Sequence, residues 1–252
     1  MNKKIIHVII LFISMTVFSQ NNEIGVFIGG SNYIGDVGPT TYINPFKYNG
    51  SRLKLLETIG TETTFYSLGF IYRKNFNSRI SARFKINYAN IGSDDKMPSS
   101  DLYRQERGKS FQNTILEYGL GIDFNFIDFD VLDSSIQMTP YINTGISLFS
   151  SNLLRYKKAI SSAEKYGSFY NYSIPITVGY KIKPFQSFII GFEITANATF
   201  TDNLDGNDPH ENAIIAPLYD ETFGSNLSKD WYVFSGITLT YLFGNKKCYC
   251  PN

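Results

Sequence analysis

Alternating apolar and polar positions are the dominant pattern of this chain. In segment 115–128 every second residue from Leu116 to Phe126 is apolar, whereas the residues between them are glycines or polar side chains that include Glu117 and Asp123. A repeat of two residues places the two sets on opposite faces of a β-strand. The segment is therefore predicted to be a strand with one oily face and one polar face.

The same alternation recurs in seven further segments. It is clear in segments 79–91, 169–182, 188–200 and 231–243, and weaker in segments 23–31, 63–75 and 139–150. Several segments exceed ten residues, which is longer than the ~5–6 residues of a typical soluble strand and sufficient for a tilted strand that crosses a bilayer. The pattern thus predicts about eight strands in an all-β fold.

The connections between the predicted strands alternate in length. Short connections are expected at 76–77, 130–135 and 183–186, and long ones at 33–62, 92–110, 152–167 and 202–230. Short turns at one end and long loops at the other are typical of a bacterial outer-membrane barrel, which closes because a bilayer cannot satisfy an open sheet edge. We therefore predict one eight-stranded antiparallel transmembrane β-barrel over residues 20–244, in the outer membrane.

A soluble sandwich or a lipocalin-like barrel is the alternative, with its oily face turned inward. The oily faces here carry large aromatics, and the chain contains 18 Tyr and 21 Phe, as expected for a barrel with aromatic girdles. The polar faces carry the glycines and the charges. Both features favour an oily face that meets lipid.

The interior of an eight-stranded barrel is only wide enough for side chains. Buried charges are tolerated when they are paired, so the charges on the polar faces are predicted to form a network that fills the barrel. Its members are Arg73, Arg83, Lys85, Glu117, Asp123, Lys181 and Glu193. A filled polar interior disfavours a wide pore.

The first 19 residues are predicted to be a signal peptide. Lys3 and Lys4 precede an apolar run at 5–18, and Ser19 fits the small-residue rule for cleavage. A membrane-anchor helix is the alternative, but the run is short for a bilayer span. Removing the segment leaves 21 basic against 22 acidic side chains, a balance that indicates no nucleic-acid partner.

Candidate chemistry is sparse along the chain. His210 is the only histidine after residue 19 and has no fixed partner for acid–base work, so we expect no enzyme, no small-molecule substrate and no cofactor. The segment Asp202–Glu211 is rich in the oxygen ligands that Ca²⁺ prefers, yet its spacing does not match an EF-hand and its residues are common in loops. No metal site is predicted from these residues.

Cys248 and Cys250 lie in a C-terminal tail, 245–252, that is expected to be periplasmic. An export compartment is oxidising, and a bridge between cysteines two residues apart strains the bond geometry. A strained internal bridge, a contact with a partner and an unstructured tail all remain open.

Four segments of the chain resemble small outer-membrane barrels of Bacteroidota. They are GGSNYIGD (29–36), YRKNFNSRIS (72–81), RGKSFQNTILEYGLGIDFNFIDFD (107–130) and TPYINTGIS (139–147). These sequences are similar to the PorG-type proteins of type IX secretion and gliding. The resemblance implies an integral outer-membrane protein, without catalytic residues, that contacts a periplasmic ring lipoprotein and its periplasmic subunit.

Within this resemblance, the matched motif is expected to end the first strand and begin the long first loop. Its residues are Gly29, Gly30, Tyr33, Gly35 and Asp36. The function expected is a structural component that anchors a periplasmic assembly through the short turns and the tail. The alternative is a surface binding or adhesion barrel that acts through its four long loops. A lipid-modifying enzyme would lack a catalytic set.

Overall fold

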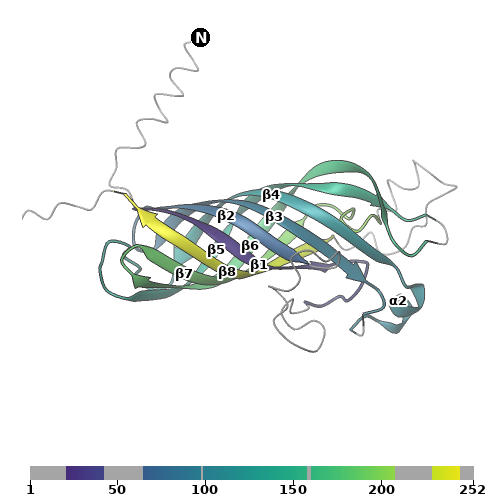
Figure 1. Ribbon diagram of the computed structural model, residues 1–252, viewed down its shortest axis with the longest axis horizontal. Helices are drawn as coiled ribbons and strands as arrows, with labels where there is room; N and C mark the ends of the chain where they lie inside the picture. Colours follow the sequence, from purple (N-terminus) through teal and green to yellow (C-terminus); the bar gives the residue numbers. More distant parts are fainter. Residues whose placement is uncertain (1–20, 43–64, 98, 158–159, 208–228, 245–252) are drawn as a thin grey trace, which may run out of the picture.

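Eight antiparallel strands form a closed barrel in which every strand pairs with its sequence neighbours and β1 pairs with β8 (Figure 1). The computed structural model describes residues 21–42, 65–97, 99–157, 160–207 and 229–244. The elements are β1 Asn21–Ile34, β2 Tyr66–Asn75, β3 Ile80–Asp94, α2 Leu102–Arg107, β4 Ser110–Asn125, β5 Gln137–Arg155, β6 Glu164–Phe185, β7 Phe188–Thr199 and β8 Trp231–Phe243. The predicted fold class is confirmed.

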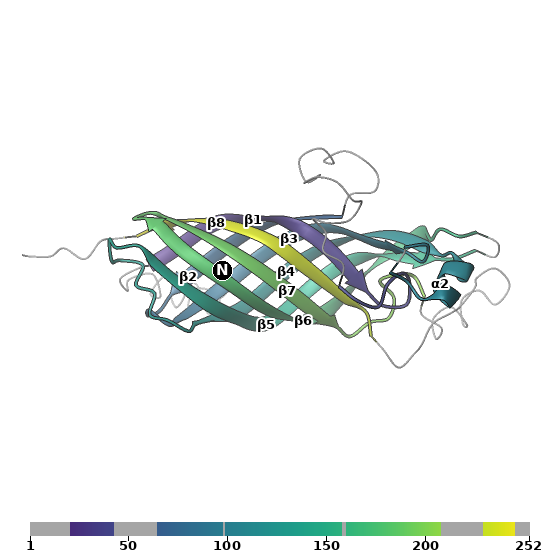
Figure 2. The same ribbon diagram turned by 90° about the horizontal axis from the view of Figure 1, so that it is seen from below.

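The two ends of the barrel differ as the connection lengths predicted. The start of β1, the end of β8 and the connections 76–79, 126–136 and 186–187 lie at one end, and α2 lies at the other (Figures 1 and 2). In outer-membrane barrels the short turns are periplasmic and the long loops extracellular. Among the described residues, no helix is long and apolar enough to cross a membrane.

The outer surface of the barrel is a belt of apolar side chains. Leu120, Ile122 and Val178 are among the most exposed of them, at 62%, 60% and 61% of their surface. An exposed apolar belt of this kind is stable only in contact with lipid, and closure leaves no unpaired strand edge in the bilayer. The protein is therefore an outer-membrane β-barrel.

The seam between β1 and β8 depends on glycine. Gly29 of β1 lies opposite Gly236 of β8, and a Cβ at Gly29 would stand 2.3 Å from the carbonyl oxygen of Ser235. The expectation that the motif ends the first strand is wrong for Gly29 and Gly30, because β1 continues to Ile34. Gly29 and Gly236 permit β1 and β8 to approach each other closely. Strand β1 ends at Ile34, just before Gly35.

Two connections differ most from their predicted lengths. The β5–β6 hairpin continues past the apolar belt, so that the loop expected at 152–167 is reduced to 156–163. Conversely, the turn expected at 130–135 spans 126–136, because β4 ends at Asn125 and β5 begins at Gln137. The loop expected at 92–110 contains the short helix α2, which the sequence did not predict.

Candidate functional site

A chain of ion pairs occupies the interior of the barrel and is its most concentrated polar feature. Arg73 pairs with Glu23 and, through Nε at 2.5 Å, with Asp123. Arg83 continues the chain, since its Nε lies 3.0 Å from Asp123 and its Nη1 lies 2.8 Å from Glu193. Inward-facing positions on strands β1, β2, β3, β4 and β7 supply these side chains.

Lys85 ends this ion-pair chain at one side, with its Nζ 3.2 Å from Glu193. The hydroxyl of Tyr141 donates a hydrogen bond of 2.7 Å to Glu193, and the same ring lies below the guanidinium of Arg83 at 5.3 Å. Charged hydrogen bonds and a cation over an aromatic face both stabilise charges that have left water. The pairs therefore hold five strands together from within.

All seven side chains that the sequence placed inside the barrel are buried there, but two of them stand outside the ion-pair chain. Glu117 accepts a hydrogen bond of 2.6 Å from the hydroxyl of Tyr232. Lys181 places its Nζ 4.7 Å from the ring centroid of Phe129 and 5.4 Å from that of Tyr141. Within the described part of the chain, neither Glu117 nor Lys181 forms an ion pair.

Sequence reasoning missed Glu23, which is fully buried and pairs with Arg73. Asn75 Nδ2 and Thr240 Oγ1 also donate to it, at 2.8 and 3.1 Å. With Glu23 added, the predicted set contains four carboxylates and four cations. The inward positions of β1 also include Phe27 and Gly29, so the alternation is weak there and the signal of Glu23 was lost.

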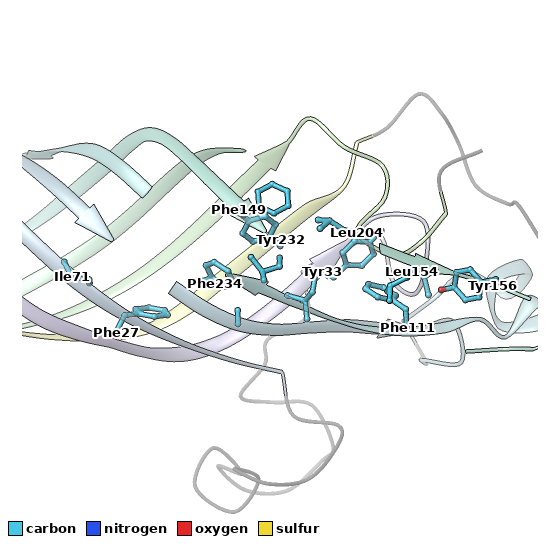
Figure 3. Packing of buried hydrophobic residues seen from close by; sticks show 14 residues of the cluster. Phe27, Tyr33, Ile71, Phe111, Phe149, Leu154, Tyr156, Leu204, Tyr232 and Phe234 are labelled. Carbon is cyan, nitrogen blue, oxygen red and sulfur yellow. The ribbon is translucent and has the colours of Figure 1, made fainter. Parts of the chain in front are cut away.

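The loop-side half of the interior is apolar and aromatic (Figure 3). Phe149 packs edge-on against Tyr232 at 5.6 Å, and Tyr33 packs edge-on against Phe111 at 4.7 Å. Phe234 extends the cluster toward Phe27. The predicted polar filling therefore describes one half of the barrel, and aromatic rings fill the other.

Two buried aspartates meet above this aromatic cluster. The hydroxyl of Tyr33 contacts Asp205 at 2.9 Å and Asp230 at 2.5 Å. Burial, together with the nearby carboxylate of Asp36, raises the pKa of Asp205 to about 7 despite the hydrogen bond with Tyr33. Burial and the charge of Asp205 likewise raise the pKa of Asp230. Tyr33 has one proton to donate, and the raised pKa values favour a proton on one of the two carboxyl groups for the second contact.

Segment 201–207, which follows β7, lies buried in the loop-side mouth of the barrel. Asn113 Nδ2 holds the carbonyl of Leu204 at 2.7 Å, and Asn207 Nδ2 donates to Asp36 at 3.3 Å. Arg104 of α2 binds the carbonyls of Gly35 and Gly38 at 2.9 and 2.7 Å. Loops after β1, β3 and β7 are thereby joined into one cap over the barrel.

The calcium candidate of the sequence falls partly within this cap. Asp202, Asp205 and Asn207 are buried there, whereas Asp208 and Glu211 lie outside the described residues. Among the described residues no group of three or more His, Cys, Asp or Glu side chains has the arrangement of a metal site. Of these candidates, Asp205 accepts hydrogen bonds from the hydroxyl of Tyr33 and from the backbone amide of Asn207, both at 2.9 Å.

The periplasmic mouth is closed by the connection 126–136. Phe129 and Val131 insert into the barrel and pack against Ile189 and Leu242. Lys183 of β6 secures the connection, because its Nζ donates to the backbone carbonyls of Asp130 (3.0 Å), Val131 (3.3 Å) and Asp133. The sequence predicted a plain turn here, and no periodic signal marks the inserted Phe129.

Several candidates of the sequence lie outside the described residues. They are the signal peptide 1–19, His210, the tail 245–252 and, within that tail, Cys248 and Cys250. The described residues form a barrel that is filled by ion pairs and rings and is capped at both ends. Such an arrangement can anchor and present surfaces on either side of the membrane.

The fold resembles solved outer-membrane barrels at low sequence identity. Ail, the attachment invasion locus protein of Yersinia pestis in complex with a heparin analogue, is 10% identical over 90% of this chain and 100% of its own, with a TM-score of 0.43. Neisserial surface protein A is 10% identical over 88% and 97%, with a score of 0.45. OprG of Pseudomonas aeruginosa is 10% identical over 90% and 98%, with a score of 0.41.

No functional conclusion follows from similarity at this level, and no curated protein matches the chain. A family model, in contrast, matches residues 2–252. The chain belongs to the family described as Domain of unknown function (DUF6089).

Proposed function

We infer that this protein is a non-enzymatic outer-membrane barrel that anchors a periplasmic assembly, as a component of type IX secretion or gliding. The periplasmic connection 126–136 carries this inference, because it is a fixed surface and not a flexible turn. Its outer side presents Ile127, Leu132 and Ile136, which are 54%, 42% and 67% exposed. Exposed apolar side chains on a rigid support are the usual anchors of a protein interface.

The rigidity of this surface has two sources. Lys183 holds three carbonyls of the connection from inside the barrel. On the outside, Arg79 of the neighbouring turn bonds Asp128 at 2.7 Å and the carbonyl of Phe126 at 2.8 Å. A preorganised surface binds with a smaller loss of conformational entropy than a mobile one. The resemblance of segments 29–36, 72–81, 107–130 and 139–147 to PorG-type barrels supports a ring lipoprotein and its periplasmic subunit as the partners.

The interior supports a role without transport or catalysis. The described ion pairs and aromatic rings fill the barrel, and its two mouths are covered by segments 201–207 and 126–136. An eight-stranded barrel has no further room for a channel once side chains fill it.

A second candidate function, surface binding or adhesion, has its own observation. Leu102 and Tyr103 of α2 are 79% and 58% exposed, and they lie beyond the barrel on the extracellular side (Figure 1). Arg104 fixes this helix to the first loop. A rigid helix with two exposed apolar side chains is suited to an external contact.

The test is affinity purification of the tagged protein from solubilised outer membranes, with mass spectrometry of the proteins that accompany it. We expect the ring lipoprotein and its periplasmic subunit with the wild type, and several-fold less of both with Leu132→Asp. Leu102→Asp is the matched control, because it adds the same charge on the opposite side of the membrane. A barrel recovered without partners, or a loss caused only by Leu102→Asp, would overturn the anchoring role.

A further inference from the structure

A small cavity lies inside the barrel beside Gly119 and Gly121 of β4. Its volume is about 20 Å³, and its lining includes Lys85, Glu117 and Ser147. Lys85 on β3 and Ser147 on β5 are the direct strand partners of Gly119. Two successive inward positions without a side chain thus leave an opening among polar neighbours.

Two polar groups beside this cavity lack a hydrogen-bond partner among the described residues, namely Nδ2 of Asn143 and Oγ of Ser147. Both residues are buried, with 5% and 1% of their surface exposed. The Nδ2 atom lies 2.7 Å from the position that a Cβ of Gly121 would take, and the Oγ atom lies 2.9 Å from that of Gly119. Both groups therefore point at the space left by the glycines.

We propose that this cavity is a binding site for one ordered water molecule. A water there accepts a hydrogen bond from Asn143 and forms others with the hydroxyl of Ser147 and the carboxylate of Glu117. Buried waters typically make about three hydrogen bonds to groups that would otherwise be unsatisfied, and one water needs roughly 10–15 Å³ on this measure. The volume and the donor set both match a single water.

The charges around the cavity favour a neutral ligand. Lys85 is paired with Glu193, and Glu117 adds a second carboxylate beside the same ammonium group. The two lining cations, Arg83 and Lys85, are already paired with carboxylates, so a bound anion would be repelled by Glu117 and a bound cation by Lys85. An unpaired charge in a barrel interior is costly, so water is the occupant that the site accepts.

The water also gives Glu117 a second partner. Its Oε2 accepts from Tyr232, and its Oε1 lies 3.9 Å from the Cβ position of Gly119. A water in the cavity between these two groups would bond Oε1 and the hydroxyl of Ser147 together. It thereby connects the Glu117–Tyr232 pair to β5, beside the end of the ion-pair chain at Lys85.

The test is a high-resolution crystal structure of the full chain, together with Gly119→Ala, whose methyl group would project into the cavity and leave no room for the water. The matched control is Gly167→Ala, whose Cβ would contact only the side chain of Leu153, at 3.2 Å. We expect density for one water within hydrogen-bonding distance of Asn143 Nδ2 and Ser147 Oγ in the wild type and in Gly167→Ala. The density should be lost in Gly119→Ala.

If Gly119→Ala does not fold, a second measurement on the wild type tests for the water. In lipid nanodiscs, a long-lived internal water gives magnetisation transfer to the amide protons of Gly119 and Ser147 in the wild type. A cavity without density, with Asn143 and Ser147 turned toward protein partners, would overturn the proposal. So would the absence of transfer, or a water that persists unchanged in Gly119→Ala.

Discussion

Replacing Arg73 by methionine removes the cation on which two buried carboxylates depend. Methionine keeps much of the length of the arginine stem and cannot pair. Glu23 then loses its ion pair and keeps the hydrogen bond from Asn75 at 2.8 Å. Asp123 keeps Arg83, whose Nε lies 3.0 Å away. The variant therefore leaves one buried carboxylate largely uncompensated.

The contacts that are lost and those that remain set the expected loss in free energy of unfolding. Removing one partner of a buried ion pair typically costs about 3–5 kcal/mol. Because Asp123 remains paired, we expect the lower end, about 3 kcal/mol, for Arg73→Met. Adding Glu23→Gln removes the uncompensated charge, so the double variant should be more stable than Arg73→Met by about 1–2 kcal/mol.

The assay is urea unfolding of the protein in lipid vesicles, followed by the fluorescence of Trp231, the only tryptophan. Arg79→Met is the matched control, because Arg79 pairs with Asp128 at 2.7 Å while the two side chains are 45% and 67% exposed. An exposed pair contributes about 0–1 kcal/mol. If Arg73→Met and Arg79→Met were equally stable, or if Glu23→Gln lowered the stability of Arg73→Met, the interior ion pairs would not hold the barrel together.

Three further predictions concern the cap, the lipid face and the periplasmic connection. The pKa of Asp205, about 7 when folded, lies above its unfolded value of about 3.9, so its contribution to the stability of the cap is complete below about pH 4 and is lost as pH rises to 7. Amide-exchange protection at Leu204 should fall over this range, and Asp205→Asn should flatten the fall. Leu120→Arg on the lipid face should cost about 2–4 kcal/mol in urea unfolding, and a neutral effect would contradict the membrane placement. Lys183→Met should speed protease cleavage within 126–136, whereas an unchanged rate would show that this lysine does not hold the connection.

The outward face of each strand was predictable because contact with lipid requires apolar side chains there. Outward positions such as Leu120 and Val178 must be apolar across the whole bilayer, so a repeat of two residues survives in the sequence. The repeat stops where the outward residues of β5 become Ser150 and Asn152. Backbone pairing needs no apolar side chain, and the hairpin continues to Arg155 beyond the last periodic residue.

The inner side was predictable only where charges marked it. Arg83 and Asp123 stand out on otherwise small or polar faces, whereas inward aromatics such as Phe149 and Tyr232 are hidden because apolar residues also stand next to them in the sequence. The pairing of Arg73 with Glu23 depends on the register between β1 and β2. The alternation within a single strand gives no information about that register. The insertion of Phe129 depends in the same way on contacts across the barrel mouth.

Site-specific photo-crosslinking in cells distinguishes the two sides of the membrane on which this barrel could act. A crosslinker at Leu132 probes the periplasmic connection, and one at Tyr103 probes the extracellular helix α2. Anchoring of a periplasmic assembly predicts specific crosslinks from Leu132 to the ring lipoprotein or its periplasmic subunit, and none to them from Tyr103. Crosslinks from Tyr103 alone, to external proteins, would contradict the anchoring role and assign the function to the extracellular loops.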